Sequence, residues 1–222
     1  TVTGSHFIHW LPVTPVGTPM RRTKEDAEKT RLKIIEAALT LFSRNGYSNT
    51  TLAMIGTEAG YSRGPIYWHF KNKEDLFQAV LAYSQEPLEQ LVAQARNGEL
   101  LPLATIERFV TRWFDLLVED AWFRQSFEIL LNKTEMTEAV SATLKRERKL
   151  TRSMISTLQE LLLAAQEEGA IPQAQPAEQL ALMVYTQLMG ITQSWLFAPR
   201  LFNLSKQRGF FAERLLVAVQ QP

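Results

Sequence analysis

The segment from residue 50 to residue 77 constrains the fold most, because it encodes two short helices joined by a tight turn. It reads TTLAMIGTEAGYSRGPIYWHFKNKEDLF. Thr50 and Thr51 are residue types that cap helix N-termini, and apolar residues follow at helical spacing. Gly60 is expected to end the first helix, since glycine accepts the left-handed conformation of a C-cap. Ser62 can then cap the second helix. Two helices joined in this way are typical of helix-turn-helix units that bind DNA.

The second helix, residues 63–70, is expected to have two different faces, because successive helical residues are about 100° apart. The inner face carries Ile66, His69 and Phe70, and the outer face carries Gly64, Pro65, Tyr67 and Trp68. Pro65 fits a first turn, where backbone N–H groups have no partner within the helix. Small residues let the backbone approach a duplex, and the aromatic O–H and N–H groups can reach phosphate oxygens.

These arguments predict a DNA-binding surface made by one set of residues. The set is Thr50, Thr51, Ser62, Arg63, Gly64, Pro65, Tyr67, Trp68, His69 and Lys73. For His69, packing and a phosphate contact both remain open.

The same region resembles the TetR family of bacterial regulators. The shared residues are Thr50-Thr51, Ala59-Gly60, SRG at 62–64, IYWHF at 66–70, and Lys73, Glu74 and Leu76. Three further segments look like the branch typified by the acriflavine-resistance repressors of multidrug efflux pumps. They are RTKEDAEKTR (22–31), FEILLNKTEM (127–136) and GITQSWLFAP (190–199). The chain departs from the family pattern at Gly56, Tyr61 and Pro65, so its operator sequence cannot be taken from relatives.

The resemblance implies an all-α fold of about nine helices and a repressor function. A three-helix DNA-binding domain would span residues 20–75, and a ligand-binding and dimerisation domain would span residues 76–222. The repressor would leave a palindromic operator of a multidrug efflux operon when a hydrophobic, often aromatic or cationic, small molecule binds. The alternative is a TetR-like protein that uses DNA binding to control another process, such as cell division, without an inducer.

Helical periodicity and capping residues predict the remaining helices, and no strand pattern or internal repeat occurs. The predicted ranges are 23–44, 73–94, 103–118, 121–132, 135–168, 177–197 and 205–219. Asp120 and Thr134 are expected to cap the helices that follow them. Residues 1–19 have no charged side chain, and we interpret them as an N-terminal extension or a vector-derived remnant.

Composition argues against several classes of protein. The chain has no cysteine and three histidines, which predicts neither a disulfide framework nor a metal site. It has no glycine-rich phosphate loop and no nucleophile–base set, so we expect no enzyme activity and no cofactor. No export signal or lipid-spanning run occurs, which predicts a cytoplasmic protein without membrane contact. Residues 20–75 hold 10 Lys and Arg against 7 Asp and Glu, which suits local contact with DNA.

The C-terminal region carries a second signal, because residues 179–198 contain no charged side chain. A helix without a charged face is buried on more than one side. We expect the helices at 177–197 and 205–219 to form a homodimer interface, with Gly190 allowing close approach of a partner helix. The alternative is a central core helix of a monomer.

Aromatic and thioether side chains in the C-terminal domain suggest a pocket for hydrophobic ligands. The predicted ligand-binding residues are Tyr83, Phe109, Trp113, Phe114, Leu117, Phe127, Glu128, Met183 and Gln187. Ordinary core packing is the competing interpretation for the apolar members. Glu128 needs a partner, because its helix should be largely buried. The partner could be Arg124, Lys133 or a cationic ligand, and we favour an internal ion pair.

Overall fold

A computed structural model describes residues 24–98 and 100–221, except for the side chain of Arg63. The predicted extension at residues 1–19 lies outside the described residues. Within them the fold is all-α, as predicted, with nine α-helices and one short 3₁₀-helix. The helices are α1 (Lys24–Asn45), α2 (Leu52–Ala59), α3 (Arg63–His69), α4 (Lys73–Arg96), α5 (Pro102–Glu119), α6 (Ala121–Asn132), η1 (Glu138–Val140), α7 (Ser141–Glu167), α8 (Ala177–Phe197) and α9 (Leu204–Gln220).

Side-chain caps explain where several of these helices begin. The Asn72 side chain accepts a hydrogen bond from the backbone N–H of Asp75, and α4 follows. The Asp120 carboxylate accepts from the N–H groups of Trp122 and Phe123, which confirms the predicted cap of α6. α4 then continues through Pro87 to Arg96 as one helix of 24 residues.

The prediction for the start of α7 is wrong. The sequence predicts a helix from residue 135 capped by Thr134, but α7 begins at Ser141 and η1 precedes it. The Thr134 hydroxyl instead donates back to the Ile129 carbonyl of α6, at 2.9 Å. Residues 133–140 pass beside the first helices, where Val140 is fully buried. Val140 is the one residue of this segment that is buried, and the helix begins only after Val140 has packed against the DNA module.

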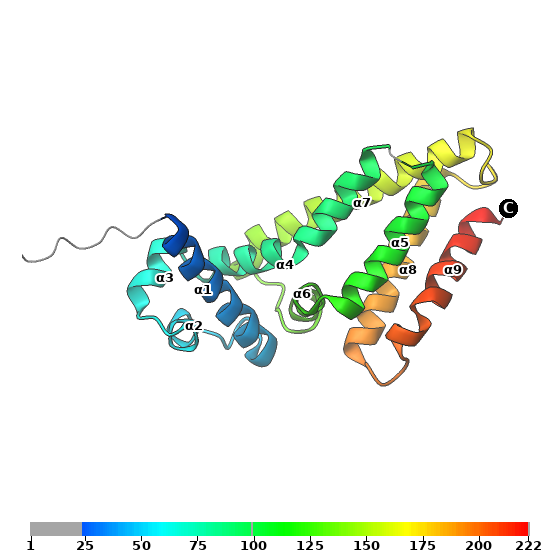
Figure 1. The fold of residues 1–222 in the computed structure, drawn as a ribbon. Helices are drawn as coiled ribbons and strands as arrows, with labels where there is room; N and C mark the ends of the chain where they lie inside the picture. The colour runs from blue at the N-terminus through cyan, green and yellow to red at the C-terminus, as the bar shows by residue number, and fades with distance from the viewer. Residues whose placement is uncertain (1–23, 99, 222) are drawn as a thin grey trace, which may run out of the picture.

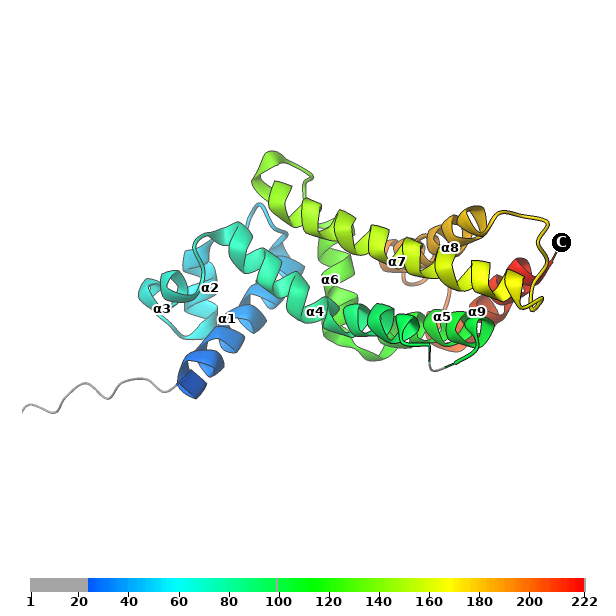
Figure 2. The same ribbon diagram turned by 90° about the horizontal axis from the view of Figure 1, so that it is seen from above.

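The molecule is elongated, with α1–α3 at one end and α5, α8 and α9 at the other (Figure 1). α4 leads from the first end into the body, and α7 lies beside it in both views (Figure 2). The first end is called the DNA module below, residues 24–72. None of the helices that the structure describes combines the length and low polarity needed to cross a bilayer.

Two clusters of buried side chains form the core, and their boundary does not coincide with residue 75. One cluster lies in the body and centres on α5, α7 and α8. The other joins the DNA module to α4, and it includes Ile129 and Leu130 of α6 and Val140 of η1. Residues beyond 76 therefore complete the core of the DNA module.

Candidate nucleic-acid interface

The helix-turn-helix unit is held by apolar side chains that α2 and α3 turn inward. Ile55 and Ile66 are fully buried, and Phe70 is 3% exposed. Gly60 has φ 73° and forms the C-cap of α2, as the sequence predicts. A Cβ on Gly56 would lie 3.0 Å from Ile66 Cδ1 and 3.1 Å from the Tyr61 carbonyl oxygen. Glycine at this position therefore allows α2 to approach the turn closely.

The outer face of α3 presents two large aromatic side chains to solvent. Tyr67 is 53% exposed and Trp68 is 69% exposed. Gly64 is exposed beside them, and Pro65 lies in the first turn, where no N–H is needed. His69 is half-buried, with its ring 4.7 Å from the Trp68 ring between centroids. Aromatic surface of this size on a seven-residue helix is unusual for a face that only meets water.

The residues at the helix starts differ in their access to a ligand. Thr51 is exposed, and its hydroxyl caps α2 by accepting from the N–H of Met54. Thr50 is fully buried, and its hydroxyl donates to the carbonyl oxygens of Gly46 and Leu41. Thr50 therefore supports the loop from behind. Ser62 occupies the N-cap position of α3, although its side chain makes no capping hydrogen bond.

Lys73 is engaged within the protein. Its ammonium group donates to the carbonyl oxygens of Tyr47 at 2.9 Å, Thr50 at 3.0 Å and Ser48 at 3.4 Å. The contacts with Tyr47 and Thr50 have ordinary hydrogen-bond lengths, and the contact with Ser48 is long. Burial lowers the pKa of Lys73. A phosphate contact by this residue stays a prediction, and its observed contacts hold the loop that starts α2.

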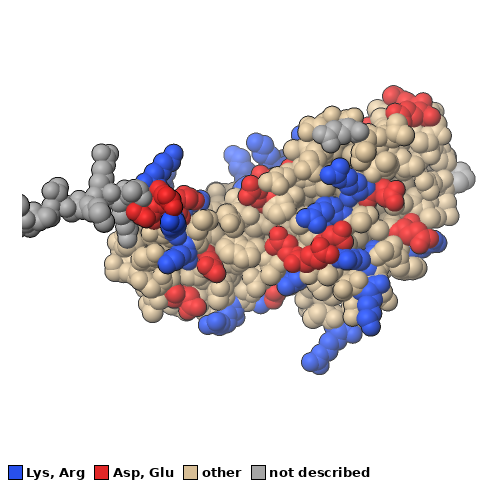
Figure 3. All heavy atoms as spheres, viewed as in Figure 1, with Lys and Arg blue, Asp and Glu red and all other residues tan. Residues whose placement is uncertain are grey.

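Charges of both signs alternate over the body on the face drawn in Figure 3. Among the described side chains of the DNA module, five exposed lysines and arginines are available to a polyanion. They are Lys24, Lys29, Lys33, Arg44 and Lys71. Only Lys29 among them forms a salt bridge within the described residues, with Glu25 at 2.7 Å. This distribution suits local contact with phosphate rather than a long-range field from the whole molecule.

The predicted dimer helices expose apolar side chains. α8 buries Leu180, Val184 and Leu188 against the body. On exposed positions, Leu182 is 43% and Phe197 is 78% accessible, and Phe210 of α9 is 59% accessible. A Cβ on Gly190 would meet no atom within 4 Å, so this position faces open space. The exposed apolar side chains of α8 lie among exposed polar ones, which include Gln179, Thr186 and Gln187.

The predicted ligand residues occupy different environments. Phe109, Trp113, Phe114, Leu117 and Phe127 are buried in the core of the body. The Trp113 ring lies 5.4 Å from that of Phe127, and its N–H donates to the Thr192 hydroxyl at 3.0 Å. These side chains pack against one another. Met183 is half-buried beside this core, whereas Gln187 is exposed on α8.

Two of the predicted ligand-binding residues carry polar groups and lie at α6: Tyr83 contacts this helix, and Glu128 belongs to it. Tyr83 is 44% exposed, and its ring lies 5.0 Å from Trp122. Glu128 pairs with Lys133 at 2.6 Å, which confirms the internal ion pair that the sequence favours. The Glu128 carboxylate is thus neutralised by a lysine of the same chain. It therefore does not need a cationic ligand as its partner.

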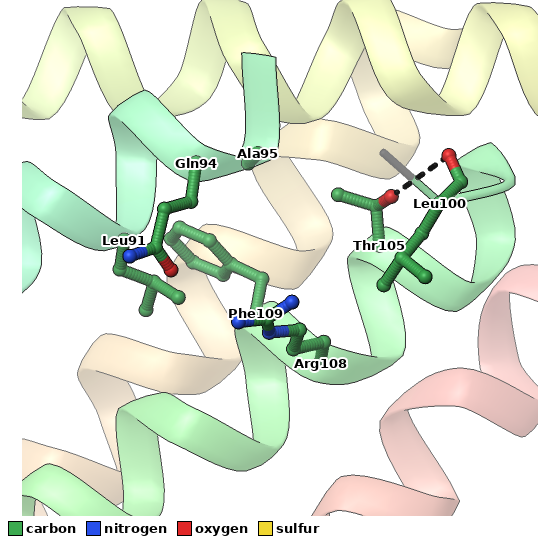
Figure 4. A pocket seen from close by; sticks show the side chains of 7 residues that line it. All are labelled: Leu91, Gln94, Ala95, Leu100, Thr105, Arg108 and Phe109. Carbon is green, nitrogen blue, oxygen red and sulfur yellow. Dashed lines mark hydrogen bonds between the residues drawn. The ribbon is translucent and has the colours of Figure 1, made fainter. Parts of the chain in front are cut away.

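A hollow of about 300 Å³, part of it open to solvent, lies between α4 and the start of α5. Figure 4 shows Phe109 and Arg108 reaching it from α5, and Leu91 and Gln94 from α4. Phe109 alone of the predicted ligand residues lines this hollow. A wider groove between α5 and α9, about 1140 Å³ with open solvent, includes Phe114. Among residues 24–98 and 100–221, no group of three His, Cys, Asp or Glu residues could hold a metal ion.

Comparison with known proteins decides the family. Residues 34–80 match the model of the bacterial regulatory proteins of the tetR family. Residues 101–220 match the C-terminal region of MAATS-type transcriptional repressors. The chain belongs to the TetR family. This TetR-family chain is 35% identical over 181 residues to the HTH-type transcriptional regulator TtgR of Pseudomonas putida, covering 81% of this chain and 86% of TtgR.

Other relatives in the family extend over most of the chain. The regulator AcrR of Shigella flexneri is 30% identical, covering 88% of this chain and 92% of AcrR. The crystal structure of NalD, described as the secondary repressor of the MexAB-OprM multidrug efflux pump in Pseudomonas aeruginosa, is 28% identical with a TM-score of 0.79. That match covers 89% of this chain and 99% of NalD. A SmeT–triclosan complex is 25% identical with a TM-score of 0.76, covering 87% of this chain and 92% of SmeT.

Proposed function

We propose that this TetR-family chain is a cytoplasmic transcriptional repressor of a multidrug efflux operon. It binds a palindromic operator as a homodimer and leaves it when a hydrophobic small molecule binds the body. The relatives TtgR and AcrR are transcriptional regulators, and NalD and SmeT are described as repressors of efflux pumps. These descriptions support the efflux operon as the target.

The exposed aromatic pair on α3 is the observation that carries the DNA-binding role. Tyr67 and Trp68 point outward while Ile66 and Phe70 hold the helix on its inner side. Recognition helices enter the major groove with their early residues near base edges. We propose that Arg63, Gly64 and Pro65 approach the bases there. Thr51 and Ser62, with the aromatic pair, contact sugars and phosphates around them.

The dimer follows from the surface of α8 and α9. Leu182, Phe197 and Phe210 would be buried between two copies, and Gly190 would let the two α8 helices approach. A two-fold dimer presents two equal recognition helices, so its operator should be a palindrome with half-sites about one helical turn apart.

The ligand response requires a difference in affinity between two states. A compound that binds better to a state with separated or rotated DNA modules will weaken operator binding, and one with equal affinity for both states will not. The packed aromatic residues of the body, Phe109, Trp113 and Phe127, have to move apart to admit such a compound. Compounds of hydrophobic, often aromatic, character fit this core.

Genome-wide mapping of bound sites tests the proposal directly. We expect one or a few promoters, next to efflux genes, and release of the operator fragment by members of a panel of dyes, bile salts and antibiotics. Dispersed sites without promoter association would favour control of another process, such as cell division. Occupancy of the body by a panel compound without loss of operator affinity would contradict the inducer mechanism.

A further inference from the structure

Apolar side chains pack the DNA module against α4 and α6, and polar contacts hold it at a further place. This place is the connector, residues 133–140, which joins α6 to α7 through η1. Figure 2 shows that it lies beside the start of α4, close to the DNA module. Val140 of the connector is buried in the same cluster as α1–α3. A rotation of the module about α4 would therefore have to break contacts with the connector.

Tyr47, in the loop between α1 and α2, makes two of these contacts. Its backbone N–H donates to the Lys133 carbonyl at 3.0 Å, and its hydroxyl donates to the Ala139 carbonyl at 3.3 Å. The ring is 5% exposed and lies 4.8 Å from the ring of Phe77 in α4. One side chain thus touches the module, α4 and the connector. The ring fixes the position of Tyr47, and the hydroxyl reaches the connector.

Glu74, in the first turn of α4 directly after the module, joins α4 to the start of α7. Its carboxylate accepts hydrogen bonds from the backbone N–H groups of Ala142 at 2.9 Å and Thr143 at 3.2 Å. These N–H groups belong to the first turn of α7, where a carboxylate is favoured by unpaired donors and by the helix dipole. No side chain of α7 itself caps this end. Glu74 therefore supplies the missing cap from another helix.

The neighbouring residues Lys73 and Glu74 contact two different parts of the molecule. Lys73 holds the loop of the DNA module by three carbonyl oxygens, and Glu74 holds α7. Tyr47 contacts both Lys73 and the connector. The Lys73 ammonium group lies 4.3 Å from the centre of the Tyr47 ring, and the Tyr47 hydroxyl donates to a carbonyl oxygen of the connector. The Lys133 ammonium group of the connector also donates to the Ser43 carbonyl oxygen of α1. These directional contacts add to the apolar packing on α4 and α6, and together they define one orientation of the module.

We propose that Tyr47 and Glu74 are positioning residues that fix the angle of the DNA module on the body and thereby set the operator half-site spacing that the dimer accepts. This inference rests on the proposed function as a dimeric operator-binding protein. Neither residue touches DNA in this role. A change of one base pair moves a half-site by about 3.4 Å along the duplex and rotates it by about a tenth of a turn. Spacing preference is therefore a direct measure of how firmly the two modules are held.

The experiment starts from an operator selected in vitro with the wild-type protein. Affinity is measured for this operator, for versions with one base pair added to or removed from the spacer, and for a duplex with a single half-site. The variants are Tyr47→Phe, which keeps the ring, and Glu74→Ala. Glu36→Ala is the matched control, because Glu36 is an exposed α1 carboxylate and its loss changes the net charge equally.

We expect Tyr47→Phe, which loses one hydrogen bond, and Glu74→Ala, which loses two, each to reduce the preference for the selected spacing by about two- to tenfold, with Glu74→Ala towards the upper end. On the duplex with a single half-site, Tyr47→Phe should bind with the affinity of wild type. Glu74→Ala should bind this duplex with the affinity of its charge-matched control, Glu36→Ala. Glu74→Gln should restore most of the preference, because an amide oxygen can accept from the same N–H groups. An unchanged preference in both variants would overturn the proposal. An equal loss of affinity for all of the duplexes would also overturn the proposal, because it would indicate general destabilisation of the protein.

A distance measurement checks the same point without relying on affinity. The chain has no cysteine, so Glu58→Cys on the exposed surface of α2 gives one spin-label site per subunit. The distance distribution between the two labels should broaden in Tyr47→Phe and Glu74→Ala and stay narrow in Glu36→Ala. Distributions of equal width would count against the proposal. If wild-type protein selects no operator at all, the proposed function fails first, and the distance distributions still report on the attachment.

Discussion

Replacement of Lys73 by methionine separates a structural role from a phosphate contact. Methionine keeps most of the unbranched apolar stem and removes the ammonium group. The two shorter hydrogen bonds, to Tyr47 at 2.9 Å and Thr50 at 3.0 Å, are the ones that count, because the third, at 3.4 Å, is long. A hydrogen bond to a charged donor contributes about 1.5–3 kcal/mol before allowance for solvent. Lys73 is only half-buried, which reduces the sum.

We therefore expect Lys73→Met to lower the free energy of unfolding by about 2–4 kcal/mol. In a chain of this size that corresponds to a melting temperature about 5–12 °C lower. Lys71→Met is the control, because Lys71 is exposed and its ammonium group forms no salt bridge or hydrogen bond among the described residues. Its effect should stay within about 0.5 kcal/mol. Denaturant unfolding followed by circular dichroism measures both.

The salt dependence of operator binding supplies the second measurement. A lost phosphate contact reduces the slope of log affinity against log salt by about one. We expect no such change for Lys73→Met, because the carbonyl oxygens of Tyr47 and Thr50 already hold the ammonium group. A slope reduced by about one together with unchanged unfolding would refute this reasoning and establish a phosphate contact instead.

Three further predictions concern the recognition face, the dimer and Tyr47. Tyr67→Ala/Trp68→Ala should weaken operator binding at least about thirtyfold in a gel-shift titration, yet leave the melting temperature near that of wild type, because both side chains are exposed. Gly190→Glu should convert the dimer to monomer in sedimentation at micromolar concentration, while Gln159→Glu on the exposed side of α7 should not; a wild-type monomer would contradict the interface. Burial, and then the charge of Glu74, raise the pKa of Tyr47, so its stabilising contribution should be present below pH 10 and lost as the pH rises through the higher native value. Urea unfolding from pH 9 upward should show this loss for wild type and a smaller one for Tyr47→Phe; parallel curves would count against it.

Local signals in the sequence were enough for the helix-turn-helix unit and for the described helices other than the start of α7. α2 begins after Thr51 and ends at Gly60, its N-cap and C-cap. α8 spans residues 177–197, as its pattern predicts. Caps act within a few residues, and the inner and outer sides of α3 follow from helical spacing alone. The difference in exposure between the buried Ile66 side chain and the exposed Trp68 side chain was therefore predictable without tertiary information.

Only the tertiary structure decided which polar groups pair and which side chains are accessible. Thr50 belongs to the predicted DNA-binding set, and the structure shows its side chain buried, with its hydroxyl bound to the Gly46 carbonyl oxygen. Lys73 lies 26 residues from Tyr47, and the Tyr47 hydroxyl binds Ala139, which is 92 residues away. Periodicity carries no information about such pairs, since they depend on how helices pack. For the same reason the sequence placed the start of α7 at residue 135. In the structure α7 begins only after Val140 has packed against the DNA module.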